Sequence, residues 1–225
     1  MKLAVVTFPG SNCDIDLIEA LEQVSGKKVL RVWHKDTSLP ALDYVFLPGG
    51  FSYGDYLRSG AIASTSPIMA AIKEFAKKGG KVVGICNGFQ ILTEARLLPG
   101  ALLPNISMHF CCKHIYIKSS GDAFSNLPSH PLRIPIAHSE GNYYCPDNIL
   151  KSMQDRNQIV FQYCTAEGLI IPEANPNGSL HNIAGICNAT YNVLGMMPHP
   201  ERAANPKMGN TDGTIILEAI LGKLS

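Results

Sequence analysis

The chain has 225 residues, of which 46% are hydrophobic, so it is long and apolar enough for one globular domain with a sizeable core and is neither disordered nor fibrous. Lys and Arg total 19 against 18 for Asp and Glu, and this balance excludes the basic footprint of a nucleic-acid or anionic-membrane binder. No stretch is apolar enough to span a bilayer and no secretory signal is evident, so we expect a cytoplasmic protein in which residues 1–225 form one domain.

The first part of the chain alternates short apolar runs with helical patterns. Predicted strands cover residues 2–8, 29–33, 44–47 and 81–86. A helix is expected after the first strand, capped by Asn12 or Asp14, and others over 68–76 and from residue 89. This alternation is typical of parallel strands with right-handed crossovers. It predicts an α/β fold with a doubly wound, mostly parallel sheet and helices on both faces.

The second half of the chain reads as strands separated by turns, with few helices between them. Predicted strands cover residues 115–118, 132–137, 159–163, 183–187 and 193–196, and a final helix covers about 214–221. Turns without crossover helices favour antiparallel pairing. We therefore expect antiparallel strands to be added to the sheet here.

Seven cysteines are present, and most are expected to be small buried hydrophobic residues. Their odd number argues against a disulfide framework, and no C-x-x-C pair suggests a zinc ribbon, so no metal site is predicted.

Cys86 stands out because it lies in the sequence Gly-Ile-Cys-Asn-Gly, between a predicted strand and a predicted helix. This is the context of a nucleophile elbow, with Cys in place of Ser. Gly84 and Gly88 would allow the close approach of neighbouring backbone that such a sharp turn needs. The helix N-terminus beyond it favours the thiolate over the thiol. A buried cysteine at a glycine-flanked strand end is the plain alternative.

His199 and Glu201 form the second candidate pair, in Met-Pro-His-Pro-Glu. Each proline biases the residue before it toward an extended backbone, in which residues two apart point the same way. Glu201 could then hold one imidazole nitrogen and support the imidazolium, as the third member of a catalytic triad does. A surface turn with a solvated Glu is the alternative for this motif taken alone.

Gly49 and Gly50 follow the third predicted strand, where ligands of such sheets bind. Their N–H groups and that of Asn87, directly after the cysteine, are candidates for an oxyanion hole. A simple turn is the alternative for either glycine. His138, after a later strand, is a candidate to line the same cleft, and a capped turn is the alternative.

Residues 84–90 (GICNGFQ) together with 198–201 (PHPE) resemble the triad-type class I glutamine amidotransferases. The loop at 48–61 (PGGFSYGDYLRSGA) is similar to that of one family among them, the glutaminase subunits of phosphoribosylformylglycinamidine synthase from purine biosynthesis. Segments 8–14 and 137–143 agree, so the resemblance covers nearly the whole chain. Relatives usually have Gly and Arg at the positions of Ser139 and Asn142, which leaves the role of those two positions open.

This resemblance implies a flavodoxin-like fold and a glutaminase with Cys86 as nucleophile, His199 as acid–base and Glu201 as its orienting partner. It also implies that Phe51, Gln90 and His138 line the glutamine site. The expected partners are a larger ATP-using synthetase subunit, which would receive the ammonia, and a small third subunit. No cofactor is expected in this chain, because ATP and magnesium would belong to the synthetase.

Two other functions compete with this interpretation. A cysteine hydrolase of the peptidase or deglycase kind would not depend on glutamine, and the loop at 48–61 argues against it. A non-enzymatic α/β binding module would have no nucleophilic cysteine.

Overall fold

The sheet at the centre of the molecule has nine strands, in the order β2-β1-β3-β4-β11-β10-β9-β6-β7. The structure is a computed structural model that describes residues 1–120 and 127–222. The strands of this sheet are β1 (Leu3–Thr7), β2 (Leu30–Trp33), β3 (Tyr44–Leu47), β4 (Lys81–Ile85), β6 (Cys111–Ser119), β7 (Leu132–His138), β9 (Ile159–Cys164), β10 (Ile183–Cys187) and β11 (Val193–Met196). The expected α/β class is confirmed.

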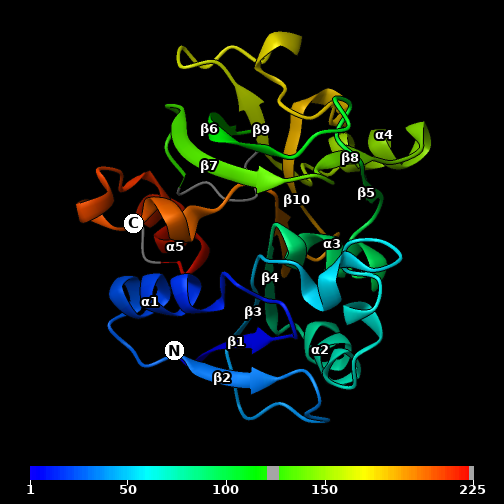
Figure 1. The fold of residues 1–225 in the computed structure, drawn as a ribbon, viewed down its shortest axis with the longest axis vertical. Helices are drawn as coiled ribbons and strands as arrows, with labels where there is room; N and C mark the ends of the chain where they lie inside the picture. The colour runs from blue at the N-terminus through cyan, green and yellow to red at the C-terminus, as the bar shows by residue number, and fades with distance from the viewer. Residues whose placement is uncertain (121–126, 223–225) are drawn as a thin grey trace.

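Five neighbouring strands, β2, β1, β3, β4 and β11, run parallel. Their helices are α1 (Asp14–Ser25), α2 (Ile68–Lys77), α3 (Asn87–Glu94) and, near the C-terminus, α5 (Asp212–Ile220). Figure 1 shows α1 and α5 on one side of this part of the sheet and α2 and α3 on the other. The doubly wound arrangement follows from crossovers that return over alternate faces.

The other half of the sheet is antiparallel from β11 through β10, β9 and β6 to β7. The predicted antiparallel addition is therefore correct except for β11, which pairs parallel with β4. Three elements were not predicted: the two-stranded sheet of β5 (Ala101–Leu103) and β8 (Asn142–Tyr144), and helix α4 (Asp147–Asp155). The two strands are only three residues long, and α4 buries only Leu150 and Met153.

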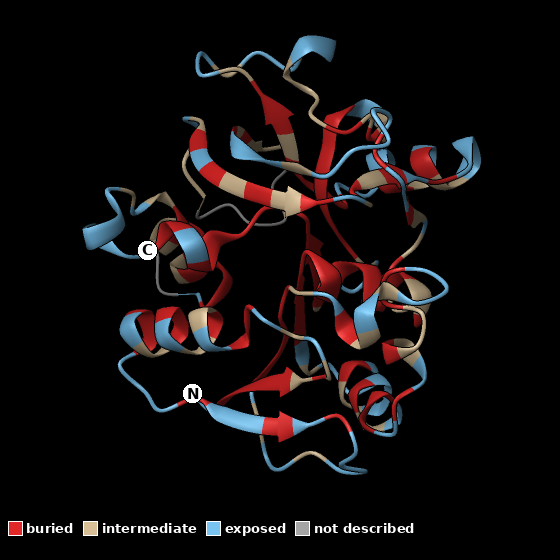
Figure 2. Cartoon of the chain, viewed as in Figure 1, coloured by how far each residue is buried: buried red, intermediate tan, exposed pale blue. Residues whose placement is uncertain are grey.

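Burial follows the pattern expected of a sheet covered on both faces. All of β3, β10 and β11 is buried, and so are the first four residues of β1. Figure 2 shows this buried layer running through the centre of the molecule, with exposed residues on the outer turns of the helices. Within the described ranges, no helix has both the length and the apolar character that crossing a membrane requires.

Candidate active site

Four parallel strands end at the same edge of the sheet and supply the residues of the candidate site. The order β1-β3-β4-β11 places their carboxyl ends next to one another. Cys13 follows β1, Gly49 follows β3, Cys86 follows β4 and His199 follows β11. Ligands of open α/β sheets bind beyond such carboxyl ends, so the topology assembles a site from four distant segments.

Cys86 adopts the strained backbone of a nucleophile elbow, with φ of 50° and ψ of −107° at the N-terminus of α3. Its N–H donates to the carbonyl of Met196 at 2.7 Å, which ties the turn to the end of β11. A Cβ at Gly84 would lie 2.5 Å from the Gly88 carbonyl oxygen, and one at Gly88 would collide with that of Leu47. Both glycines are therefore needed for the close packing expected around the turn.

His199 and Glu201 form a buried pair in which the imidazole Nδ1 lies 2.6 Å from Oε1 of the carboxylate. The pairing of the two side chains was predicted from an extended backbone, and that backbone is wrong for Glu201, which lies in a 3-10 turn (Pro200–Ala203). The carboxylate is acceptor-only, so Nδ1 carries the proton and donates it. Nε2 of His199 is buried and has no hydrogen-bond partner within the described ranges. The nitrogen that would act as a base is thus left available.

The electrostatic surroundings favour a protonated His199. Burial alone would lower its pKa, but the charge of Glu201, and then the interaction with Cys86, outweigh burial and raise the pKa of His199 well above its usual value. The adjacent strands β4 and β11 bring Cys86 and His199 to the same edge of the sheet, where the N–H of Cys86 donates to Met196. A thiolate and an imidazolium that stabilise each other are the resting state that cysteine hydrolases use.

Gly49 and Gly50 lie against the imidazole and the loop after β1. A Cβ at Gly49 would lie 2.6 Å from Cε1 of His199, and one at Gly50 would lie 2.6 Å from the backbone nitrogen of Asn12. The side chain of Asn87 accepts from the N–H of Ser52 at 3.2 Å and so holds the loop after β3 beside α3. Asn87 thus adjoins the nucleophile and Gly49 adjoins the imidazole, while the predicted oxyanion role of all three residues stays a prediction.

The three residues predicted to bind glutamine differ in their surroundings. Phe51 is 41% exposed, with its ring 6.3 Å from that of Phe110. Gln90 is buried, and its amide donates to the backbone oxygen of Glu140 at 2.7 Å and accepts from the side chain of Asn87 at 2.9 Å. Phe51 can contact a ligand, whereas Gln90 links α3 to the turn after β7.

His138 is buried in a polar network beside the site. Its Nδ1 lies 3.1 Å from Oδ1 of Asn105 and its Nε2 lies 3.4 Å from the side-chain nitrogen of Asn177. Burial, and then the charge of His199, lower its pKa to about 4. His138 is therefore neutral at physiological pH, and both of its ring nitrogens contact protein side chains. This arrangement suits a residue that supports the wall of the site, and not one that binds the substrate. The side-chain oxygen of Asn105 also accepts a hydrogen bond from the N–H of Gly141 at 3.0 Å.

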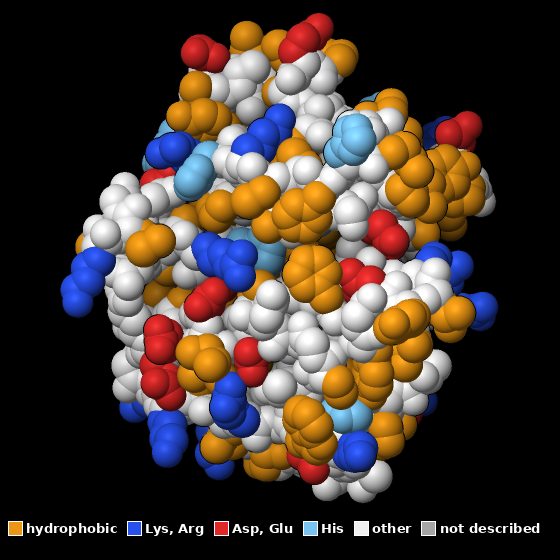
Figure 3. Space-filling view, viewed as in Figure 1, with side chains coloured by type: hydrophobic (Ala, Val, Ile, Leu, Met, Phe, Trp, Pro, Cys, Tyr) orange, Lys and Arg blue, Asp and Glu red, His pale blue; other side chains and the backbone are white. Residues whose placement is uncertain are grey.

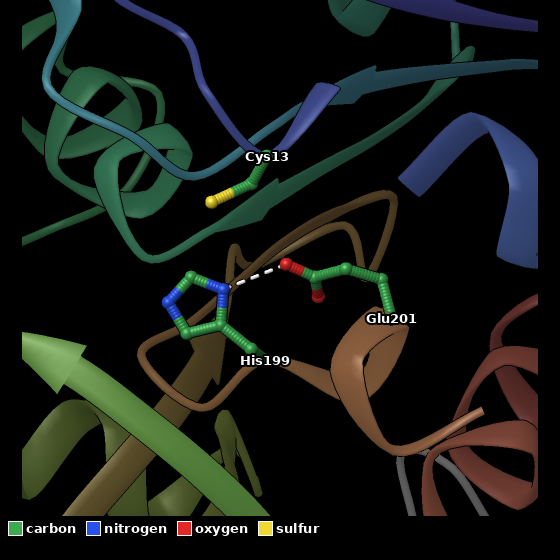
Figure 4. Close-up of side chains that lie close together, drawn as sticks. All are labelled: Cys13, His199 and Glu201. Atoms are coloured by element: carbon green, nitrogen blue, oxygen red, sulfur yellow. Dashed lines mark hydrogen bonds and ion pairs between the residues drawn. The ribbon is translucent and has the colours of Figure 1, made fainter. Parts of the chain in front are cut away.

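Cys13 and Arg202 also lie at the site, and neither was predicted from the sequence. Cys13 lies at the N-terminus of α1, where neither predicted cap forms a side-chain hydrogen bond to the helix. Its sulfur, a nitrogen of His199 and an oxygen of Glu201 all lie within 4.8 Å of one another (Figure 4). The position of Cys13 after β1, next to the strand before Gly49, was the available signal.

Asp55 is a further residue near the site that was not predicted from the sequence. It lies in the loop after β3, where the side chain of Asn87 donates to it at 3.3 Å. Burial raises its pKa to about 6, and the charge of Glu140 acts in the same direction. Two carboxyl groups thus meet beside α3, at the rim of the site.

A metal ion is one interpretation of Cys13, His199 and Glu201, since their ligand atoms have suitable spacing. The Nδ1 of His199, however, already donates to Glu201, and a guanidinium nitrogen of Arg202 lies 3.1 Å from the sulfur of Cys13. A cation entering here would meet that positive charge. The arrangement fits acid–base chemistry at Cys86 better than metal binding.

Comparisons with known proteins agree with this geometry. Residues 1–213 match the family model of the CobB/CobQ-like glutamine amidotransferase domain. The chain is 51% identical to phosphoribosylformylglycinamidine synthase subunit PurQ of Koribacter versatilis, over 100% of this chain and 99% of that protein. It is 52% identical to the protein of the same name in Moorella thermoacetica, over 98% and 95%.

Solved structures give the same result. One chain of the structure of PurLQS from Thermotoga maritima matches with a TM-score of 0.85 and 40% identity, and all of both chains is covered. A glutamine amidotransferase from the same organism matches with a TM-score of 0.61 at 16% identity, which concerns the fold alone.

Proposed function

Because the chain belongs to the CobB/CobQ-like glutamine amidotransferase family, we propose that it is the glutaminase subunit of phosphoribosylformylglycinamidine synthase, with Cys86, His199 and Glu201 as its catalytic triad. The observation that carries the triad is the buried His199–Glu201 pair, 2.6 Å apart, beside the strained turn at Cys86. Such a set of nucleophile, base and orienting carboxylate is what acyl transfer from an amide requires.

In the first step, the Cys86 thiolate attacks the side-chain amide carbon of glutamine. The C–N bond breaks as the imidazolium of His199 gives its Nε2 proton to the leaving nitrogen, and ammonia and a γ-glutamyl thioester result. In the second step, Nε2 takes a proton from water, the hydroxide attacks the thioester carbon, and glutamate leaves while Cys86 returns to the thiolate. Glu201 keeps Nδ1 protonated throughout and so directs Nε2 to the sulfur.

Backbone N–H groups at Gly49, Gly50 and Asn87 are proposed to stabilise the oxyanion of both tetrahedral intermediates. Support comes from their position, since Gly49 lies against the ring of His199 and Asn87 directly follows the nucleophile. Phe51 is proposed to line the glutamine site. Gln90 and His138 are proposed to hold its walls, because their polar atoms bond to neighbouring protein groups.

The ammonia is proposed to pass to a synthetase partner that amidates formylglycinamide ribonucleotide, with a small third subunit in the same complex. The matching chain belongs to a structure named PurLQS, from Thermotoga maritima, which supports a complex of several subunits. We propose that ATP and magnesium belong to the synthetase and that this chain needs no cofactor. Residues 1–225 are proposed to act as one domain, because strands from both halves of the chain share one sheet. A cytoplasmic location stays a prediction.

The test is labelling of the chain with a glutamine-like diazo-ketone, followed by peptide mapping. We expect modification of Cys86 that glutamine prevents, and loss of glutamine hydrolysis by at least about 10³-fold in Cys86→Ala and His199→Ala. Labelling at another cysteine, or turnover in Cys86→Ala, would refute the triad. A peptidase or deglycase would process its own substrates without glutamine, and a binding module would not be labelled.

A further inference from the structure

A second cysteine, Cys13, lies beside the His199–Glu201 pair. Figure 4 shows Cys13 pointing toward His199 and Glu201 from the loop that precedes α1. Ligand atoms of the three side chains lie within 4.8 Å of one another, and Cys13 is only 2% exposed. The mechanism above assigns Cys13 no role, although it contacts the groups on which that mechanism depends.

Arg202 completes this arrangement. Its guanidinium donates to the sulfur of Cys13 at 3.1 Å and to a carboxylate oxygen of Asp16, on α1, at 3.2 Å. Burial disfavours the charged guanidinium, but the charges of Cys13, Glu201 and Asp16 outweigh it and raise the pKa of Arg202. Arg202 is thus a cation held by α1. It follows Glu201, whose buried Oε2 has no hydrogen-bond partner among the residues that the structure describes.

The position of Cys13 is fixed by the loop beside it. A Cβ at Gly49 would lie 3.2 Å from the sulfur, and the N–H of Phe51 donates to the carbonyl of Gly10 at 2.9 Å. A Cβ at Gly50 would lie 2.6 Å from the nitrogen of Asn12. The loops after β1 and β3 therefore pack as one unit, so the sulfur cannot shift without moving the glycines beside the imidazole.

We propose that Cys13 and Arg202 are positioning residues for glutamine hydrolysis, forming a buried sulfur–guanidinium contact that holds the His199–Glu201 pair in the orientation that reaches Cys86. This inference rests on the proposed function and deepens it. Neither residue touches the reacting atoms. Both act through the imidazole and its carboxylate, and a base must be held within a fraction of an ångström of its target for an efficient proton transfer.

The charged and titratable groups around the imidazole come from every side of the site. They are Cys13 from the loop before α1, Cys86 from the elbow, His138 from β7, and Glu201 and Arg202 from the turn after β11. Cys13 belongs to the groups that favour the imidazolium. Its removal should therefore let His199 lose its proton at lower pH, which moves the basic limb of the rate profile in the acid direction.

The test compares Cys13→Ala and Cys13→Ser with Cys187→Ala, in the full chain bound to its synthetase. Cys187 is equally buried but lies at the end of β10 that points away from the site, so it is a matched control. We expect Cys13→Ala to lower kcat about tenfold, the equivalent of one charge-assisted hydrogen bond, with KM nearly unchanged. The basic limb should move to lower pH, and Cys13→Ser should recover part of kcat, because its hydroxyl can accept from Arg202.

A double-mutant cycle distinguishes positioning from a general effect on folding. If Cys13 acts through the pair, Cys13→Ala should cost little further activity in a Glu201→Gln background. Arg202→Lys should keep more activity than Arg202→Gln. Full additivity with Glu201→Gln, or a Cys13→Ala enzyme with the kcat and pH profile of Cys187→Ala, would overturn the proposal. If Cys86→Ala is inactive while one of these two results is obtained, only the positioning role of Cys13 is refuted, and the proposed function is retained.

Discussion

At the scale of single residues, the molecule separates the roles of two carboxylates. Glu201 is buried and pairs with His199, whereas Asp55 lies at the rim with a pKa raised to about 6 by burial and by the charge of Glu140. Burial and a neighbouring like charge both favour the protonated form of a carboxyl group such as that of Asp55. Glu201 therefore serves the imidazole, whereas Asp55 makes the stability of the fold depend on pH.

Glu201→Gln should lower kcat for glutamine hydrolysis about 10²-fold, less than the loss of Cys86 or His199, because the amide can orient the ring but cannot stabilise the imidazolium. The charge of Glu201 helps to raise the pKa of His199, so the basic limb of the kcat/KM profile should also move to lower pH. Steady-state assays from pH 6 to 10 measure both effects. An unchanged profile would mean that Glu201 does not support the acid–base group.

Gly49→Ala should abolish most glutamine hydrolysis, because the new methyl group would lie 2.6 Å from Cε1 of His199 and 3.2 Å from the sulfur of Cys13. Gly79→Ala is the control: its φ of 87° strains an alanine, but nothing lies within 4 Å, so activity should be kept despite a small loss of stability. Equal activity in the two variants would contradict the packing described.

Cys86, His199 and Glu201 could be selected from the sequence because local motifs suggest their chemistry. The structure brings their segments to one edge of the sheet, while their catalytic roles stay predictions. Cys13 and Arg202 were not predicted. Cys13 looks like an ordinary residue at a strand-to-helix turn, and only the sheet order brings it within 4.8 Å of a pair almost two hundred positions later. Contacts of this kind depend on tertiary structure and leave no local pattern.

At the scale of elements, the loop after β3 is bound to α3 at several points. Arg58 makes a bidentate ion pair with Glu94, with nitrogen–oxygen distances of 2.6 and 2.9 Å, and Asn87 holds the N–H of Ser52. Gln90 then joins α3 to the turn after β7. The elbow helix is the element to which both walls of the site are attached.

Gln90→Leu should lower the free energy of unfolding by about 1–3 kcal/mol, because it leaves the carbonyl of Glu140 and the amide of Asn87 without these partners. Urea denaturation measures the change. Gln154→Leu, at an exposed position on α4, is the control and should change stability by less than about 0.5 kcal/mol. Equal stability of the two variants would show that Gln90 does not bridge the walls.

Asp55→Asn should raise Tm near pH 7.5 by a few degrees. The folded-state pKa of Asp55, about 6, lies above the ordinary 3.8, so its stabilising contribution is complete below 3.8 and is lost as pH rises through 6. The variant should therefore gain more at pH 7.5 than at pH 4.5, as thermal unfolding would show. Asp155→Asn, exposed on α4, is the control, and an Asp55 variant that is less stable at pH 7.5 would contradict this sign.

The elements of the parallel half were predicted well because each combines an apolar strand, a glycine-rich turn and an amphipathic helix. The three elements that were missed, β5, β8 and α4, carry weak patterns: two strands of three residues each and a helix with two buried residues. The parallel pairing of β11 with β4 was also missed. Turn length indicates how a strand meets its neighbour in sequence, whereas β11 pairs across more than a hundred residues.

At the scale of the whole molecule, the near-neutral surface and the exposed rim of the site agree with work inside a complex. Figure 3 shows apolar, acidic and basic side chains interspersed on the face viewed there, without a dominant sign of charge. Phe51 and Phe110, at 41% and 50% exposure, leave aromatic surface open beside the site. Aromatic residues of this kind are enriched at protein interfaces.

We expect the isolated chain to hydrolyse glutamine at least about tenfold more slowly than the complex with its synthetase. Ammonia released to water is protonated and loses the lone pair that the synthetase reaction needs, so turnover without the partner would consume glutamine without forming product. Stopped assays of glutamate formation, with and without the partner, measure the difference. The complex carrying Cys86→Ala should bind equally but stay inactive, and full turnover by the isolated chain would contradict this coupling.

The insertion of β11 between β4 and β10 has a consequence during synthesis. A polypeptide still emerging from the ribosome can pair β1 to β4 early, but the central position next to β4 stays empty until β11 arrives. His199 and Glu201 follow β11 in the chain, so the proposed site cannot form until β11 has been synthesised. Translation must be nearly complete before β11 joins the two halves of the sheet and the proposed site can become active.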